Sequence, residues 1–160
     1  MKKIVIFGSY NGSSIGDIAL LLGLISSVKR VEPECQITVL TTQKIGLKQE
    51  INALHGYDIK NIDEVCIFRN KADYKGLKNK FKFYALRLYQ KVFNKSVVNK
   101  VKVKNILNNA DHLIIGGGNL IMDLFPQWPL ILNSIIEVAN INKIRYSFVG
   151  IGAAPISTPL

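Results

Sequence analysis

The stretch KIVIFGSYNGSSIGD, residues 3–17, joins the pattern of a buried strand to a glycine-rich loop. Its apolar run is β-branched and aromatic up to the first glycine, as expected of a central strand covered on both faces. Gly8, Gly12 and Gly16 follow at intervals of four, and Asp17 then precedes apolar residues at helical spacing. We expect Asp17 to be the N-cap of that helix. The order of strand, glycine loop and helix predicts an α/β fold with a ligand loop after its first strand.

Strands and helices alternate through the rest of the chain. We expect further strands at residues 36–42, 64–68, 112–118 and 145–152, and helices at 17–32, 45–54, 75–93, 96–109 and 129–142. This alternation predicts right-handed crossovers and a Rossmann-like, open, mostly parallel sheet of about five strands, with helices on both faces. We find no internal repeat, and the length fits one domain over residues 1–160.

The composition is that of a globular protein, with 48% hydrophobic and 20% charged residues. Cys35 and Cys66 each lie in an apolar run, so we expect neither a disulfide nor a metal site, and a reducing, cytoplasmic compartment. The longest apolar run, residues 18–25, is far shorter than the roughly 20 residues that cross a bilayer. We therefore expect a soluble or at most peripheral protein.

The basic character is confined to one segment, at about residues 69–109. Twelve Lys or Arg and a single acid, Asp73, lie between Arg69 and Lys104, and the other residues are nearly neutral. One interpretation is a pair of core-facing helices with a solvated basic side. Another is peripheral contact of residues 75–104 with an anionic membrane, at the inner face of the cell membrane. We expect no nucleic acid as partner, because no nucleic-acid-binding motif is present.

Three of the expected strands end in glycines: GSYNGSSIGD (8–17), GGGNLIMD (116–123) and GIGAAP (150–155). Ligands of open α/β sheets bind at the carboxyl ends of the strands, where glycines let a ligand approach the backbone. Helix N-termini beyond the first two loops favour an anion or a polar ligand. The alternatives are tight packing for the glycines and capping for Asp17, Asn119 and Asp123. The candidate substrate-binding residues are Gly8, Asn11, Gly12, Ser13, Gly16, Asp17, Gly116, Gly117, Gly118, Asn119, Asp123 and Gly152.

The glycine spacing excludes the common nucleotide loops. A dinucleotide fingerprint requires G-x-G-x-x-G, and a Walker loop requires a lysine after its last glycine, where this chain has Asp17. GGGN has no serine at its apex and is therefore no nucleophile elbow. The sequence supports neither an NAD site nor an ATP site.

Three motifs together resemble the polysaccharide pyruvyl transferase family. FGSYNGSSIGDIALLLGL (7–24) is similar to the family's N-terminal signature, and ADHLIIGGGNLIMD (110–123) to its second. FVGIGAAPI (148–156) is similar to the third, although Ala154 stands where the family usually has glycine. The order and spacing of the three motifs match over nearly the whole chain.

The resemblance implies transfer of pyruvate, as a ketal, from phosphoenolpyruvate to a sugar of a cell-surface or exported polysaccharide or of its lipid-linked precursor. Phosphoenolpyruvate is then the donor substrate, and no cofactor is implied. Family members have two domains in a glycosyltransferase-like (GT-B-like) architecture, with the donor groups in the second. We therefore interpret this chain as the N-terminal half, inactive alone, with the C-terminal domain absent and no catalytic residue assigned.

Several alternatives remain open on the residues themselves. His55 and His112 are interpreted as structural, and Trp128 either stacks on a sugar or anchors the packing. The alternative functions are a non-catalytic or degenerate Rossmann-like binding domain, and half of a nucleotide-sugar glycosyltransferase.

Overall fold

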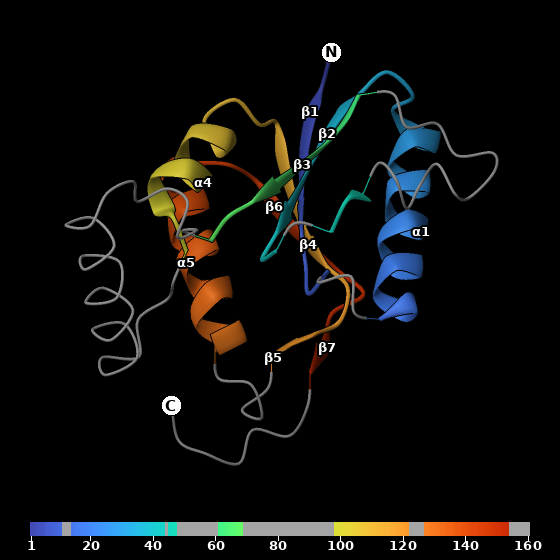
Figure 1. The fold of residues 1–160 in the computed structure, drawn as a ribbon. Helices are drawn as coiled ribbons and strands as arrows, with labels where there is room; N and C mark the ends of the chain where they lie inside the picture. Colours follow the sequence, from blue (N-terminus) through green and yellow to red (C-terminus); the bar gives the residue numbers. More distant parts are fainter. Residues whose placement is uncertain (11–13, 44, 48–60, 69–97, 122–126, 154–160) are drawn as a thin grey trace, which may run out of the picture.

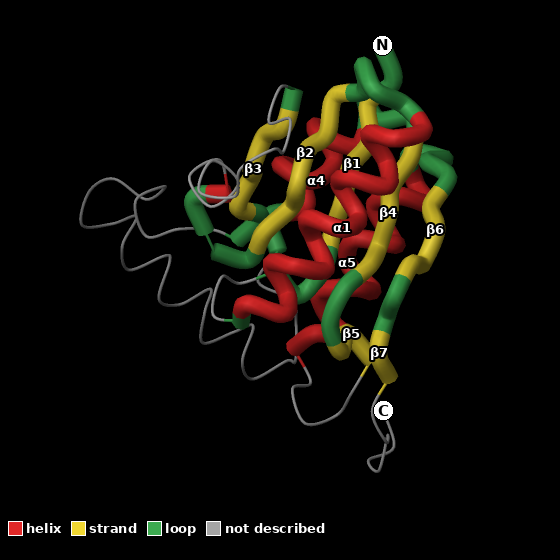
Figure 2. The backbone as a smooth tube through the Cα atoms, turned by 90° about the vertical axis from the view of Figure 1, so that its right-hand side faces the viewer, coloured by secondary structure: helices red, strands yellow, loops and turns green. Residues whose placement is uncertain are grey.

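A computed structural model describes residues 1–10, 14–43, 45–47, 61–68, 98–121 and 127–153 of the chain. Its centre is a five-stranded sheet in which every neighbouring pair is parallel. Figure 2 shows the strands side by side in the order β3-β2-β1-β4-β6, and Figure 1 shows the same sheet nearly edge-on. The strands are β1 (Lys3–Phe7), β2 (Gln36–Thr41), β3 (Ile62–Cys66), β4 (His112–Gly116) and β6 (Tyr146–Val149). The expected open, parallel, Rossmann-like sheet is confirmed.

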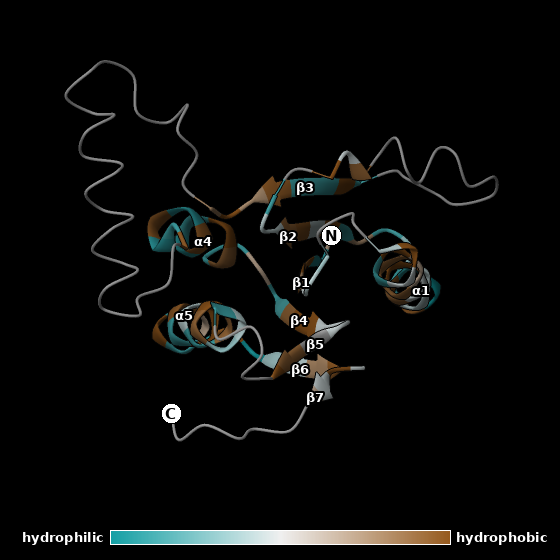
Figure 3. Ribbon diagram, turned by 60° about the horizontal axis from the view of Figure 1, so that its bottom comes forward, coloured by the Kyte–Doolittle hydropathy of each residue, from teal (hydrophilic) through white to brown (hydrophobic). Residues whose placement is uncertain are grey.

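Helices cover both faces of this sheet, as the alternating pattern predicts. Figure 3 shows α1 (Ile15–Val31) on one side, and α4 (Lys100–Leu107) and α5 (Gln127–Ile141) together on the other. The helix expected at 129–142 is α5, which begins two residues earlier than expected, at Gln127.

Two apolar cores fill the spaces between the sheet and its helices. Ile6 of β1 belongs to the core under α1, whereas Val5 and Phe7 belong to the core under α4 and α5. Successive residues of a strand point to opposite faces, so a central strand needs apolar residues throughout. The uninterrupted apolar run of β1 thus reflects its place in the middle of the sheet.

The strand order reverses between β1 and β4. From β1 the chain proceeds outward through β2 to β3, then returns through α4 to β4 and proceeds the other way to β6. Phe7 and Ile115 are partners in the parallel ladder, so β1 and β4 end next to each other. In open α/β sheets this switch point opens the crevice in which ligands bind.

The N-cap of α1 is Ser14, so the prediction that Asp17 caps this helix is wrong. Ser14 has the extended backbone of an N-cap (φ −127°, ψ 124°), and its Oγ accepts a hydrogen bond from the Asp17 backbone N–H at 3.5 Å. Asp17 lies in the first turn instead. Its carboxylate therefore interacts with the positive end of the helix dipole and does not close the turn.

Two expected strands are each divided by glycines. β4 ends at Gly116, because Gly117 and Gly118 take positive φ values of 78° and 73°. β6 ends at Val149, before Gly150 with φ 59°. The chain then forms a second, two-stranded parallel sheet from β5 (Asn119–Ile121) and β7 (Gly152–Ala153), beyond the carboxyl edge of the main sheet (Figure 2). The expectation of one strand at 112–118 and one at 145–152 is therefore wrong: the first is divided into β4 and β5, and the second into β6 and β7.

Two other boundaries differ from the expected ones. β3 spans Ile62–Cys66 instead of 64–68, because Ile62 pairs with Ile37 of β2. The helix expected at 96–109 begins only at Lys100, since Val98 pairs with Phe68 and Asn99 caps the helix. Pairing between distant segments fixed both boundaries, and sequence periodicity does not report such pairing.

The basic segment lies mostly outside the described residues, as do the helix expected at 75–93 and nearly all of that expected at 45–54. Its described part, α4, buries Val103 and Leu107 in the core. Lys100 Nζ contacts Glu137 of α5 at 2.6 Å, and Lys102 Nζ donates to the Cys66 carbonyl at 2.8 Å. For α4 these contacts favour the interpretation of a core-facing helix. Among the described helices, none has the length and apolarity that a bilayer crossing needs.

Candidate functional site

The three glycine turns meet at the carboxyl edge of the sheet, beside the switch point. Ser9 N–H donates to the Gly117 carbonyl at 3.4 Å, and Gly117 N–H donates to the Val149 carbonyl at 3.3 Å. Gly152 N–H in turn donates to the Gly118 carbonyl at 3.0 Å. The expectation that these turns share one sheet edge is therefore confirmed.

Close packing accounts for the absence of side chains at several of these glycines. A Cβ at Gly8 would lie 1.9 Å from the Gly116 carbonyl oxygen, and one at Gly116 would lie 2.3 Å from the Val149 carbonyl oxygen. Both neighbours are backbone atoms that cannot swing aside. The alternative of tight packing thus explains Gly8 and Gly116, and contact of either glycine with a ligand stays a prediction.

Tyr10 lies at the centre of these turns and has the one side chain among the described residues with a buried, unpartnered polar atom. It is 1% exposed, and its ring lies against Gly8 and Gly117, where a Cβ would come within 2.6 Å of it. Its hydroxyl has no hydrogen-bond partner within the described structure. Burial raises the pKa of Tyr10 well above its usual range, and the nearby charge of Asp17 adds to that shift. The hydroxyl is therefore protonated at neutral pH.

Sequence reasoning missed Tyr10. The signal for it was a single aromatic residue inside a run of small and polar ones, SYNGSS, which requires glycines nearby to make room for a ring. Only the fold shows that the Tyr10 ring lies between Gly8 and Gly117, which belong to different loops.

Two polar side chains gather at the turn that Gly118 forms. A Cβ at Gly118 would lie 1.7 Å from Ser9 Oγ and 3.6 Å from Asp17 Oδ1. Ser9 Oγ itself donates to the Gly117 carbonyl at 3.4 Å, which is a long hydrogen bond. Burial raises the pKa of the Asp17 carboxyl above its ordinary value. We refer to Ser9, Asp17, Gly117 and Gly118 as the switch-point site.

The charge around the switch-point site favours a neutral, hydroxylated ligand over a phosphate. The sequence that follows β1, β4 and β6 (8–17, 116–126 and 150–160) contains no Lys, Arg or His. Asp17 already supplies a negative group to the N-terminal turn of α1. Carboxylate and hydroxyl oxygens suit sugar hydroxyls, whereas a phosphate here would face a carboxylate with no compensating cation from these three stretches. The sequence left open an anion or a neutral polar molecule as the ligand, and the neutral polar molecule fits this site better.

The other predicted site residues have different positions. Asn11, Gly12, Ser13 and Asp123 lie outside the described residues. Asn119 begins β5, Gly152 begins β7, and Gly16 lies in the first turn of α1.

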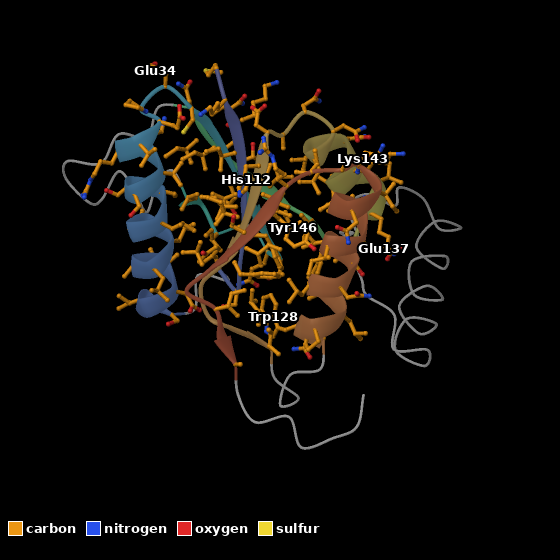
Figure 4. The ribbon with its side chains drawn as sticks, turned by 180° about the vertical axis from the view of Figure 1, so that it is seen from behind. Glu34, His112, Trp128, Glu137, Lys143 and Tyr146 are labelled. Carbon is orange, nitrogen blue, oxygen red and sulfur yellow. The ribbon has the colours of Figure 1, made fainter. Side chains whose placement is uncertain are left out.

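His112 lies away from this site, and Trp128 packs against the core. His112 begins β4 at the opposite edge of the sheet, where its Nε2 lies 2.9 Å from Ser147 Oγ. Trp128 lies in the first turn of α5 and packs against the apolar core, which favours its packing role over sugar stacking (Figure 4). His55 lies outside the described residues.

Both cysteines are free thiols, with Cys35 buried and Cys66 partly buried. Burial raises the pKa of Cys35, and so disfavours its thiolate. Within the described ranges no three His, Cys, Asp or Glu residues come together as metal ligands would.

The comparisons with known proteins give no neighbour for this arrangement. No family model matches the chain, and searches of curated proteins and of solved structures found no match.

Proposed function

We propose that the switch-point site binds a sugar, and that this chain is the acceptor-binding half of a polysaccharide pyruvyl transferase. The observation that carries the sugar site is the convergence of Ser9 Oγ and the Asp17 carboxylate on the Gly118 turn, at the strand-order reversal. The pyruvyl-transfer reaction is proposed from the resemblance of the three glycine motifs, which the fold brings to one edge.

The chemistry of the site suits an acceptor that carries hydroxyl groups. The Asp17 carboxylate accepts a hydrogen bond from one sugar hydroxyl, and Ser9 Oγ exchanges its long bond to Gly117 for a second. Hydrogen bonds to charged groups contribute more than neutral ones, so Asp17 is the main anchor. Its role in this proposal is to orient the hydroxyl that attacks.

The donor requires groups that these loops do not have. In the proposed reaction phosphoenolpyruvate takes a proton on its methylene carbon, two sugar oxygens bond to its central carbon, and phosphate leaves. The phosphate and the carboxylate need cationic partners. Because the stretches that follow β1, β4 and β6 contain no basic residue, we assign the donor to a second domain across the crevice, as in a GT-B-like enzyme.

The acceptor in this proposal is a glycan or lipid-linked saccharide on the cytoplasmic side of a bacterial membrane. Contact of residues 75–104 with anionic lipid belongs to the same proposal. Within that segment, Lys100 and Lys102 already bind Glu137 and the Cys66 carbonyl. We therefore assign the proposed lipid contact to residues 75–97.

Titration of the isotope-labelled chain with sugars, followed by NMR, tests the acceptor site. Methyl glycosides of glucose, galactose and mannose are the probes, and we expect amide shifts at Ser9, Asp17 and Gly118 with at least one of them. Asp17→Asn removes the charged acceptor and should weaken binding about tenfold or more, whereas Glu34→Gln, at an exposed acid of the opposite edge (Figure 4), should not. If the sugar-induced amide shifts and the affinity are the same in Asp17→Asn as in the wild type, the sugar does not bind at this site.

A non-catalytic binding domain is the second candidate. Packing alone accounts for glycine at positions 8 and 116, so these two glycines are not evidence for catalysis. Phosphate release from phosphoenolpyruvate distinguishes the transferase from the binding domain. It is measured with this chain joined to the second domain that the proposal requires. Release that depends on a glycan supports the transferase, and sugar binding without any turnover supports the binding domain.

A further inference from the structure

One edge of the five-stranded sheet is formed by β6, and no described strand pairs with its outer side (Figure 2). The carbonyl oxygens of Arg145 and Val149 accept backbone hydrogen bonds, at 3.0 and 3.3 Å, from the segment that contains β4. The backbone groups of successive strand residues point to alternate sides. Tyr146 and Phe148 therefore direct their N–H and C=O groups away from β4, where an edge strand presents them to another chain.

The side chains of β6 are those of a strand inside a sheet. Phe148 is 52% exposed and Val149 is 45% exposed, and as successive residues they lie on opposite faces. Tyr146 lies on the same face as Phe148, and the two rings meet edge-on with their centroids 5.8 Å apart. Apolar side chains on both faces are typical of a strand that has neighbours on both sides. β6 is thus an edge strand with the residues of an interior one.

The two edges of the sheet differ in charge. β3, at the other edge, contains Asp63 and Glu64, and charged residues on an edge strand discourage pairing with a second chain. β6 has no charged residue and no proline between Tyr146 and Val149. Pairing with another strand is therefore favoured at β6 over β3.

We propose that β6 pairs with β6 of a second copy of this chain, antiparallel and in the register centred on Ser147. A two-fold axis at Ser147 places Tyr146 of each copy opposite Phe148 of the other. Each of these pairs exchanges two backbone hydrogen bonds, so the outward N–H and C=O groups of both strands are satisfied. The switch-point site takes no part in this pairing, and the proposal can fail independently of sugar binding.

The same register matches the side chains, which is why a second copy is the partner. Tyr146 and Phe148 form aromatic cross-strand pairs, and the two Ser147 hydroxyls meet at the axis; both kinds of pair stabilise antiparallel strands. Arg145 lies opposite Val149, so the two arginines are not brought together. The edge is complementary to itself, as a two-fold interface requires.

Cysteine cross-linking tests the register. The two Ser147 residues form a non-hydrogen-bonded pair with Cα atoms about 4.5 Å apart, which a disulfide can span. Under mild oxidation of the full chain, Ser147→Cys should therefore give a disulfide-linked dimer on a non-reducing gel. In Arg145→Cys, the matched control, the two Cα atoms would be roughly 13 Å apart, so it should give about tenfold less dimer or none. The wild-type chain, with its two free cysteines, gives the background. Equal cross-linking of the two variants, or none in either, contradicts the register.

Sedimentation equilibrium of the reduced chain measures the association itself, and we expect a monomer–dimer equilibrium. Phe148→Lys removes both aromatic pairs and adds charge to the edge, so it should weaken dimerisation about tenfold or more. Val101→Lys makes the same kind of change at an apolar residue of α4 that is 66% exposed, and it should have no effect. A monomer at every concentration would overturn the proposal, as would a dimer that Phe148→Lys leaves unaffected.

Hydrogen exchange distinguishes a second copy from another segment of the same chain. The Tyr146 amide points outward and should be protected in the wild-type dimer, and it should exchange faster in Phe148→Lys. Protection of this amide in a chain that sediments as a monomer would mean that another part of the chain covers β6, and the proposal would then be wrong.

Discussion

Glycines serve two different purposes in the two regions that face each other at the switch point. Where β1 and β4 end, Gly8, Gly116 and Gly118 are enclosed, and an added Cβ would overlap atoms of a neighbouring strand or turn. In α1, Gly16 and Gly23 are open, and an added Cβ meets ordinary contact or nothing. The same residue type is thus a packing requirement in one region and an unoccupied surface in the other. The difference can be tested by substitution.

Gly8→Ala should have the largest effect. Its Cβ would lie 1.9 Å from the Gly116 carbonyl oxygen and 2.6 Å from the Tyr10 ring, so β1 and β4 would have to separate. We expect the free energy of unfolding, measured by denaturant titration, to fall by about 3 kcal/mol or more. A loss below 1 kcal/mol would show that the two turns are not packed this closely.

Tyr10→Phe should act in the opposite direction. The hydroxyl is buried without a partner among the described residues, and leaving a donor unpaired costs about 1–3 kcal/mol. Removing it keeps the ring against Gly8 and Gly117, so we expect the free energy of unfolding to rise by about 1 kcal/mol. A decrease of similar size would mean that the hydroxyl does have a partner.

Gly23→Ala tests the open region. Gly23 lies inside α1 with free space around its Cβ position, and Ala is favoured over Gly within a helix by about 0.8–1.0 kcal/mol. The melting temperature and the free energy of unfolding should both increase. Destabilisation here would show that α1 packs against something at this position and would break the contrast with Gly8.

Asp17→Asn should have the smallest effect on stability, and one that depends on pH. Burial raises the pKa of the folded carboxyl above 3.8, so the folded state holds this proton more tightly than the unfolded state. The contribution of Asp17 to stability is then complete below that pH and is lost as the pH rises through the folded pKa. Relative to the wild type, the variant should gain stability between about pH 3 and pH 6, by less than about 0.5 kcal/mol. Parallel unfolding curves at these pH values measure this, and a variant that loses stability with rising pH would reverse the sign.

Local patterns predicted most of the elements. The apolar runs of β1 and β2 and the helical spacing of α1 and α5 placed these four elements within a few residues, because each buries its own side chains at its own period. The glycines after three strands likewise predicted one shared edge, since parallel strands must end together.

Two predicted boundaries were wrong for different reasons, one local and one distant. SSIGD offers several capping residues, and the backbone angles of Ser14, rather than residue type, decided between Ser14 and Asp17. β3 begins two residues early because Ile62 pairs with Ile37. The pairing of Ile62 is not visible in a local pattern, whereas Ser14 and Asp17 stand at the local spacing of a capping box.

The sequence by itself determined the α/β class, the parallel sheet and the gathering of three glycine turns, because hydrophobic period and strand direction are local properties. Only the tertiary structure decided what the turns enclose. It placed the Tyr10 ring between Gly8 and Gly117, brought Ser9 and Asp17 to Gly118, and left a groove along α1 open. The first two depend on Tyr10, Ser9 and Asp17 meeting glycines about 100 residues further along the chain, at the β1–β4 switch point. Packing across such a distance leaves no periodic trace in a single sequence.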